Sequence, residues 1–140
     1  MDQEKFAQSD LKVLLVEDDR EFADILRIRL SKETNPRLAI TCLPTLQQAQ
    51  QALTETTWDL ILLDLMLPKI DGYRVCGMLK FDKNFRNTPI IILTARAAES
   101  DKEMGKEAGA DLYLTKPFEP DVLIAKVKDL LKADVRDIGT

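Results

Sequence analysis

The sequence contains no histidine among its 140 residues. Histidine is the commonest general base near neutral pH and the commonest zinc ligand, and every Ser-His-Asp arrangement needs one. The chain also has only two cysteines, Cys42 and Cys76, which are far apart in the sequence and in no metal-ligand spacing. These absences exclude histidine-based catalysis and Cys/His zinc sites, so any chemistry must use carboxylates, amines and hydroxyls.

Long apolar runs are absent too. The first ten residues are polar and contain no apolar core of a signal peptide, and no run approaches the roughly 20 residues of a transmembrane helix. The sequence leaves a disulfide open, but both cysteines fall inside apolar segments. We therefore interpret them as reduced, buried thiols and expect a cytoplasmic protein with no membrane contact.

A surplus of basic residues is likewise missing. Twenty Lys and Arg stand against 24 Asp and Glu, which gives a formal net charge of −4. Binding to nucleic-acid phosphates needs a basic surface, so we expect no direct contact with nucleic acid. Hydrophobic residues make up 45% and charged residues 31%, as in ordinary globular proteins, and the length suits one domain.

Short apolar runs alternate along the chain with longer segments of helical spacing. The runs predict five strands at Leu11–Val16, Leu38–Leu43, Leu60–Leu63, Ile90–Leu93 and Leu112–Leu114. The segments between and after them predict five helices, since apolar residues recur at three- and four-residue intervals. Strands that alternate with helices form βαβ units and a parallel sheet, and runs such as LILL and IIIL are typical of strands covered on both faces.

Helix-boundary signals agree with this division. Thr45 with Gln48 predicts a capping box, Gly109 follows a helical run, and Pro120 fits the first turn of the last helix. Asp19 is interpreted as an acidic residue at a helix N-terminus, where its charge favours the macrodipole. We predict one three-layer α/β domain over residues 11–133, with a flexible tail at 1–10 and a tail or linker start at 134–140.

Polar residues follow four of the five predicted strands. The first is followed by Glu17, Asp18 and Asp19, the third by Asp64, the fourth by Thr94, and the fifth by Thr115 and Lys116. In open α/β sheets ligands bind at the carboxyl ends of the strands. The sequence therefore predicts a site at this edge that combines carboxylates, a hydroxyl and an amine.

These residues and their motifs resemble the receiver domain of two-component response regulators. The resemblance rests on LLVEDD, LILLDLMLP followed by DG, PIIILTA and GADLYLTKPF, and on the 30 positions from Asp64 to Thr94 and the 22 from Thr94 to Lys116. It covers residues 11–133. It implies a flavodoxin-like, doubly wound sheet of five parallel strands in the order 2-1-3-4-5, with five helices.

The resemblance also implies the chemistry. Asp64 would accept a phosphoryl group from a sensor histidine kinase or a phosphotransfer protein. Mg²⁺, or Mn²⁺, would be held by Glu17, Asp18, Asp64 and the backbone carbonyl of Met66; oxygen ligands suit such ions, and the cation relieves repulsion among crowded carboxylates. The chain would catalyse only its own phosphoryl transfer and dephosphorylation, so it is not expected to be an enzyme in the wider sense.

By the same resemblance, Thr94 and Lys116 would stabilise the phosphoryl oxygens, and Thr94 and Tyr113 would form the switch. The switch would change the surface of the fourth helix, fifth strand and fifth helix, which would bind a downstream effector or output domain. The Lys116–Pro117 bond is expected to be cis.

Three alternative interpretations differ from this one in the residues they require. A haloacid-dehalogenase-like phosphatase needs a second acid two residues after the nucleophile, where this chain has Met66. A phosphorylation-independent binding module usually lacks the phosphoacceptor, an acid or the lysine, all of which are present. A receiver fragment of a larger transcription regulator or hybrid kinase stays open.

The chain departs from the winged-helix transcription subfamily at its charged dimer contacts. Met66 and Arg96 match that subfamily where it tunes the phosphoryl lifetime, but Leu112 replaces an acid, Met104 an arginine and Val122 a glutamate. These changes remove partners of ion pairs. We therefore expect a monomer or a weak, phosphorylation-dependent dimer.

Overall fold

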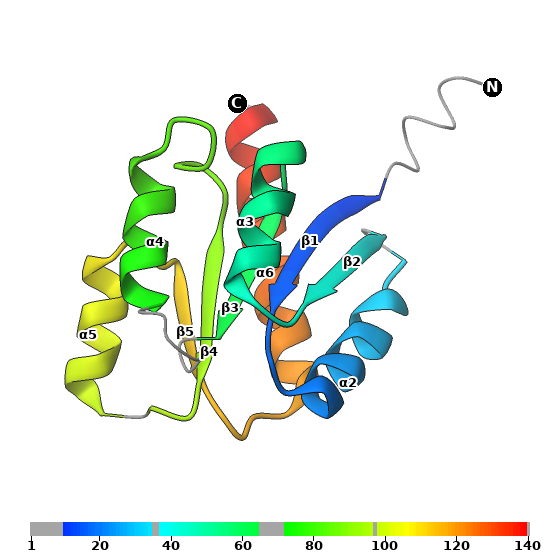
Figure 1. The fold of residues 1–140 in the computed structure, drawn as a ribbon. Helices are drawn as coiled ribbons and strands as arrows, with labels where there is room; N and C mark the ends of the chain where they lie inside the picture. The colour runs from blue at the N-terminus through cyan, green and yellow to red at the C-terminus, as the bar shows by residue number, and fades with distance from the viewer. Residues whose placement is uncertain (1–9, 35–36, 65–71, 97, 140) are drawn as a thin grey trace.

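The computed structural model describes residues 10–34, 37–64, 72–96 and 98–139, with side chains as far as Leu131. Strands and helices alternate along this chain (Figure 1). The strands are β1 (Leu11–Val16), β2 (Leu38–Leu43), β3 (Leu60–Asp64), β4 (Ile90–Thr94) and β5 (Leu112–Thr115). The helices are α2 (Arg20–Ser31), α3 (Leu46–Glu55), α4 (Gly72–Phe81), α5 (Glu99–Glu107) and α6 (Pro120–Gly139).

The five strands form one parallel sheet in the order β2-β1-β3-β4-β5. This order confirms the predicted flavodoxin-like topology. The chain reverses direction across the sheet at β1, so β1 and β3 lie side by side at the centre. Their carboxyl ends flank the switch point where open α/β sheets bind ligands.

Helices cover both faces of the sheet. One face of β1 presents Val13 and Leu15 to a core shared with α2 and α6, while Leu14 and Val16 face a second core shared with α3 and α4. Successive side chains of a strand point to opposite faces, so a strand buried on both sides has to be apolar throughout. Burying each such side chain stabilises the fold by about 1.5–3 kcal/mol.

The helix-boundary signals act as the sequence predicts. The Asp19 carboxylate accepts a hydrogen bond from the Phe22 N–H at 3.1 Å, and the Thr45 hydroxyl oxygen accepts one from the Gln48 N–H at 3.2 Å. Gly109, just beyond α5, has a φ of 101°, which favours glycine. The Lys116–Pro117 bond is cis, as expected.

Three strands extend one residue further than the sequence predicts. Asp64, Thr94 and Thr115 are the last residues of their strands, where they had been placed just outside them. Backbone pairing continues through them, since Asp64 pairs with Leu93 and Thr94 with Thr115. Apolar runs end where the side chain becomes polar, whereas the hydrogen-bonded ladder ends a residue later.

The tail or linker start predicted for residues 134–140 is helical as far as Gly139, because helix α6 continues to that residue. No proline or glycine interrupts the sequence between Pro120 and Gly139, so local backbone preference lets the helix run on. Residues 1–9 of the predicted N-terminal tail lie outside the described residues.

Neither cysteine forms a disulfide: Cys76 is a buried free thiol and Cys42 a half-buried one. Burial raises the pKa of the Cys76 thiol to about 11. Within the described part of the chain, no helix is both long enough and apolar enough to cross a membrane.

Candidate functional site

The predicted site residues meet at the carboxyl edge of the sheet. Glu17 is fixed directly after β1 by a backbone hydrogen bond from its N–H to the Leu43 carbonyl, at 3.1 Å. Lys116 is fixed directly after β5 by a bond from its N–H to the Thr94 carbonyl, at 2.7 Å. Asp64 ends β3 between them. The parallel ladder therefore brings together residues that are up to 99 positions apart in the chain.

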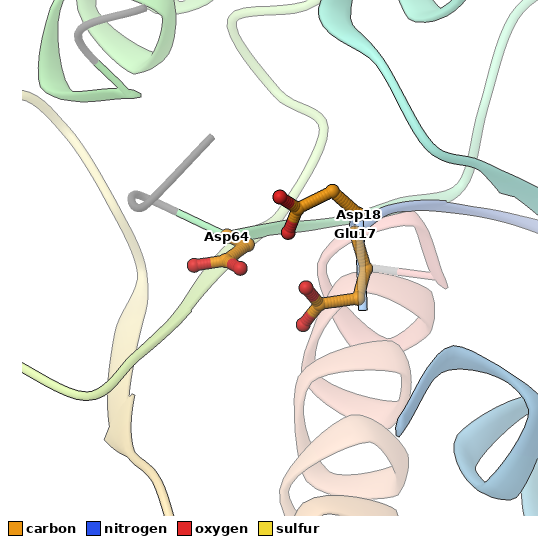
Figure 2. A group of neighbouring side chains, drawn as sticks. All are labelled: Glu17, Asp18 and Asp64. Carbon is orange, nitrogen blue, oxygen red and sulfur yellow. The ribbon is translucent and has the colours of Figure 1, made fainter. Parts of the chain in front are cut away.

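Three carboxylates form a compact cluster. One oxygen each from Glu17, Asp18 and Asp64 lies within 4.8 Å of the others (Figure 2). Glu17 and Asp64 are each only 3% exposed, whereas Asp18 is exposed to solvent. Close carboxylates repel one another, and a buried one is costly unless it is paired.

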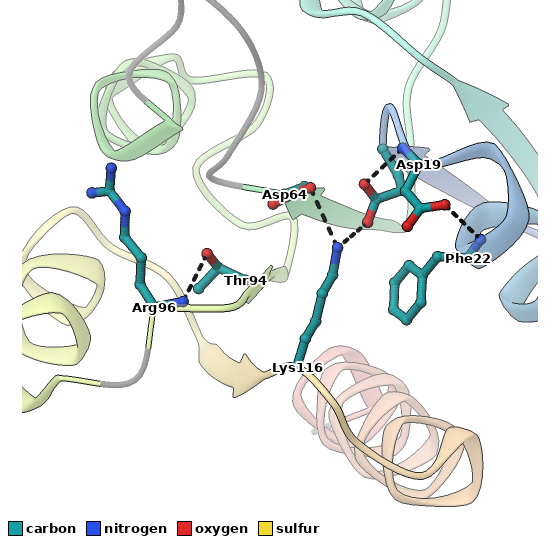
Figure 3. Close-up of polar contacts among 7 residues, drawn as sticks. Asp19, Phe22, Asp64, Thr94, Arg96 and Lys116 are labelled. Atoms are coloured by element: carbon teal, nitrogen blue, oxygen red, sulfur yellow. Dashed lines mark hydrogen bonds and ion pairs between the residues drawn. The ribbon is translucent and has the colours of Figure 1, made fainter.

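Lys116 supplies a positive charge to this cluster. Its ε-ammonium donates to the Glu17 carboxylate at 2.5 Å and lies 3.4 Å from the Asp64 carboxylate (Figure 3). One ammonium therefore faces two buried carboxylates. With Asp18 included, the cluster carries three potential negative charges against one positive charge.

The ionisation of Glu17 and Lys116 reflects this imbalance. Burial raises the pKa of the Glu17 carboxyl to about 7, the Asp64 carboxylate adds to the rise, and Lys116 opposes it. Burial alone lowers the pKa of the Lys116 ammonium, but the two carboxylates outweigh that effect and raise it. One lysine does not fully compensate the acids.

Thr94 and Tyr113 are joined through the backbone of one residue. The Thr94 hydroxyl oxygen, on a fully buried side chain, accepts a hydrogen bond from the Arg96 N–H at 3.3 Å. The Tyr113 hydroxyl donates to the Arg96 carbonyl at 3.0 Å. Burial, together with Tyr73, raises the pKa of the Tyr113 phenol, which keeps it protonated. The two predicted switch residues thus bind the backbone N–H and the backbone carbonyl of the same residue, Arg96.

The acidic triplet after β1 separates into two roles. Asp19 lies at the N-terminus of α2, as predicted, and caps it, while its own N–H donates to the Glu17 carboxylate at 3.2 Å. Met66, the predicted carbonyl ligand, lies outside the described residues.

Sequence reasoning missed two sets of contacts around the site. The Phe22 ring packs against the core that α2 and α6 share, and it also lies beside the Lys116 ammonium. The Tyr73 hydroxyl donates to the Asp101 carbonyl at 3.0 Å and so joins α4 to α5. An aromatic residue in the first turn after the acidic triplet was the available signal for the first set. No feature of the sequence indicated the second set, the contact between Tyr73 and Asp101.

The cluster fits a hard divalent cation. All its candidate ligands are carboxylate oxygens, which Mg²⁺ and related ions prefer, and their separation allows one ion to contact all three. A divalent cation would also supply the positive charge that Lys116 alone does not. The residues present could therefore hold a divalent metal.

Comparison with known proteins agrees with the fold. The response regulator receiver domain family matches residues 13–128. RpaA of Synechocystis, a DNA-binding dual master transcriptional regulator, is 36% identical over 122 residues, which are 86% of this chain and 49% of RpaA.

Solved receiver domains superpose closely. The receiver domain of the Francisella response regulator 1452 has a TM-score of 0.79 at 32% identity and covers 89% of this chain and 98% of that one. The BeF3-activated receiver domain of DrrB, a protein of Thermotoga maritima, has a TM-score of 0.75 at 31% identity, over 89% and 99%.

The chain therefore belongs to the response regulator receiver domain family of two-component systems. It spans about half the length of the curated relatives it matches, which are transcriptional regulators.

Proposed function

We propose that this chain is the phosphoacceptor receiver of a two-component phosphorelay and that Asp64 takes the phosphoryl group. The observation that carries the proposal is the placement of Asp64: its carboxylate is 3% exposed at the end of a central strand, beside two further carboxylates and the Lys116 ammonium. Two acidic neighbours would only destabilise an aspartate with a purely structural role. They suit a nucleophile that must bind a cation and accept a phosphoryl group.

The reaction is a transfer from a phosphohistidine of a sensor histidine kinase or phosphotransfer protein. A bond forms between an Asp64 carboxylate oxygen and phosphorus, the phosphorus–nitrogen bond of the donor breaks, and the leaving imidazole takes up a proton. Attack by water on the acyl phosphate later returns Asp64 and inorganic phosphate. The chain acts on itself in both steps and turns over no separate substrate.

Glu17, Asp18 and Asp64 would hold Mg²⁺, or Mn²⁺, with the Met66 carbonyl as a further ligand. When bound, the cation neutralises charge on the phosphoryl oxygens and on the nucleophile. Glu17 and Asp18 come from one loop and Asp64 from the next strand, so the two sides of the metal site are set by the β1–β3 pairing.

Lys116 and Thr94 act on the phosphoryl group itself. The ammonium lies against Asp64 from the β5 side, where it can stabilise one phosphoryl oxygen. The Thr94 hydroxyl ends the neighbouring strand and can donate to another. In its bond with the Arg96 N–H the hydroxyl oxygen is the acceptor, so its own proton remains available for that donation.

The switch follows from movement of the Thr94 side chain. When Thr94 turns toward the phosphoryl group, its contact with the Arg96 N–H weakens, and the Arg96 backbone, whose carbonyl accepts from the Tyr113 hydroxyl, can shift. Tyr113 then rotates inward and alters the surface formed by α5, β5 and α6. The phosphoryl charge shifts a pre-existing equilibrium between two arrangements.

We place the protein in the cytoplasm. Its partners on this proposal are the kinase and an effector or output domain on the α5–β5–α6 face, with no direct contact to nucleic acid or membrane. The regulators among its relatives support an output in transcription.

The test is phosphorylation by a small phosphodonor, acetyl phosphate, with Mg²⁺ present. We expect a hydroxylamine-sensitive adduct on the wild-type chain, detected by a shift in a phosphate-affinity gel. Asp64→Asn should abolish it. Asp24→Asn, an exposed acid on α2, is the matched control and should be phosphorylated normally.

An adduct that survives Asp64→Asn would place the phosphoacceptor elsewhere. No adduct on the wild type, together with unchanged binding to an effector, would favour a phosphorylation-independent binding module.

A further inference from the structure

The Lys116 ammonium has a neighbour besides its two carboxylates. Its Nζ lies 4.2 Å from the centre of the Phe22 ring (Figure 3). That ring meets Phe118 edge-on, with centroids 5.6 Å apart and ring planes at 84°. The lysine side chain is only 20% exposed. The ammonium therefore lies between an acidic side and an aromatic side.

The aromatic side is apolar, but it also attracts the ammonium electrostatically. The face of a phenyl ring carries partial negative charge, and a cation within about 6 Å of its centre is attracted to it, more strongly when water is excluded. The edge-to-face contact with Phe118 fixes the orientation of the Phe22 ring.

Phe22 is also tied to the acidic side of the site. It lies in the first turn of α2, where its N–H donates to the Asp19 carboxylate at 3.1 Å. Asp19 directly follows Glu17 and Asp18. The ring and two of the three carboxylates, those of Glu17 and Asp18, are thus carried by one short segment, and the loop after β5 brings Lys116 to both.

We propose that Phe22 is a positioning residue for Lys116: its ring holds the ammonium against the site independently of Glu17. The inference rests on the proposed phosphoacceptor function. Glu17 is both the nearest partner of the ammonium and a candidate ligand of the cation, so the lysine needs a second restraint that the cation does not draw away. An uncharged ring meets that need, because it attracts the ammonium without competing for the metal.

The first experiment looks at the contact directly and needs no phosphorylation. The methylene next to the Lys116 nitrogen lies close to the aromatic ring, so its proton signal should be displaced upfield in spectra of ¹³C-lysine-labelled protein, with Lys116→Arg used for assignment. Phe22→Leu should return this signal to the position of an ordinary lysine. Phe22→Tyr should keep it displaced.

The second experiment measures the consequence for the reaction. Replacing the Phe22 ring by pentafluorophenyl keeps its shape and reverses its charge distribution. We expect this variant and Phe22→Leu to take up phosphoryl groups from acetyl phosphate about fivefold more slowly than wild type. Phe22→Tyr should react at close to the wild-type rate.

Loss of packing alone would slow Phe22→Leu but leave the pentafluorophenyl variant at the wild-type rate, and that result would overturn the proposal. An ordinary lysine signal in the wild type would overturn it as well. If wild-type Asp64 takes up no phosphoryl group, the proposed function falls, and the lysine signal alone decides whether Phe22 holds the ammonium.

Discussion

Glu17 and Asp19 show how two acids in one triplet come to differ. Glu17 follows the last residue of a buried strand, so its carboxylate points into the site, where it is 3% exposed. Asp19 precedes the first residue of α2, so its carboxylate turns back to cap the helix in contact with solvent. Position relative to the strand end and the helix start decides the role, and residue type does not.

The separate roles of these acids lead to a prediction about metal binding. We expect Mg²⁺ to raise the melting temperature, because the cation binds the folded carboxylate cluster and not the unfolded chain. At a free concentration ten times the dissociation constant, the gain is about 1.4 kcal/mol, or roughly 3–6 °C for a domain of this size. Differential scanning fluorimetry with and without Mg²⁺ measures it.

Two neighbouring variants make the prediction specific. Asp18→Asn removes a carboxylate from the cluster and should lose most of the Mg²⁺ response. Asp19→Asn keeps a good helix cap and leaves the cluster intact, so it should respond like wild type. Equal responses of the two variants would show that the cation binds the surface non-specifically.

A second prediction concerns Thr94. Thr94→Ala removes the hydroxyl that couples the phosphoryl group to the Arg96 peptide, but it leaves Asp64 and Lys116 in place. We expect phosphorylation to persist and the response of Tyr113 to weaken. With 3-fluorotyrosine in the chain, the ¹⁹F signals that come from the protein itself are those of Tyr73 and Tyr113; the signals of added beryllofluoride and fluoride are identified in a sample without protein. The Tyr113 signal should move on addition of beryllofluoride in the wild type and much less in Thr94→Ala.

Tyr73→Phe assigns the two signals. An unchanged Tyr113 response in Thr94→Ala would mean that the signal bypasses the threonine.

At the scale of single helices, two glycines in similar positions have opposite surroundings. Apart from its chain neighbours and the backbone of its own helix, Gly77, inside α4, has no atom within 4 Å of the position that a Cβ would take. A Cβ on Gly105, inside α5, would lie 2.8 Å from the Tyr113 ring. Helix propensity favours alanine at both sites by about 1 kcal/mol. Packing therefore decides whether each Gly→Ala substitution stabilises or destabilises the fold.

We therefore expect Gly77→Ala to stabilise the fold by about 0.5–1 kcal/mol. Gly105→Ala should be destabilising by about 1 kcal/mol, because overpacking against Tyr113 outweighs the gain in helix propensity. Urea unfolding with a common m-value measures both. The two variants serve as controls for each other, and stabilisation of both would mean that the Tyr113 ring moves aside freely.

Single strands and helices also show how much of the fold the local sequence pattern predicts. Runs such as Leu60–Leu63 identified every strand, since a strand covered on both faces must be apolar throughout. They ended one residue early at Asp64, Thr94 and Thr115, where backbone pairing outlasts the apolar pattern. The end of α6 was missed because an amphipathic stripe identifies the part of a helix packed on the core, not where the helix stops.

At the scale of the whole molecule, the candidate site was predictable because sheet topology concentrates strand ends on one edge. Glu17, Asp64 and Lys116 follow three different strands, and one rule for open α/β sheets brings them together. The Phe22 ring and the Arg96 peptide were not predictable in the same way. Their contacts with Lys116, Thr94 and Tyr113 depend on side-chain directions that no periodic pattern encodes.

The last prediction concerns the dimerisation of this chain. Met104 and Val122 are 48% and 43% exposed, on α5 and α6, and Leu112 begins β5 nearby. These three replace the charged residues that form dimer contacts in the winged-helix subfamily, so we expect sedimentation velocity with beryllofluoride to show a monomer or a weak dimer.

Restoring the charges tests the cause of this weakness. In a two-fold symmetric dimer each ion pair occurs twice, and an exposed pair contributes about 0.2–1 kcal/mol. The combined substitutions Met104→Arg, Leu112→Asp and Val122→Glu should therefore tighten the beryllofluoride-dependent dimer by about tenfold or more. The same substitutions should have no effect without beryllofluoride, because the α5–β5–α6 surface is then in its other arrangement. A tight dimer of the unsubstituted chain on this face would contradict the prediction, since apolar contacts through Met104 and Val122 would then replace the missing ion pairs.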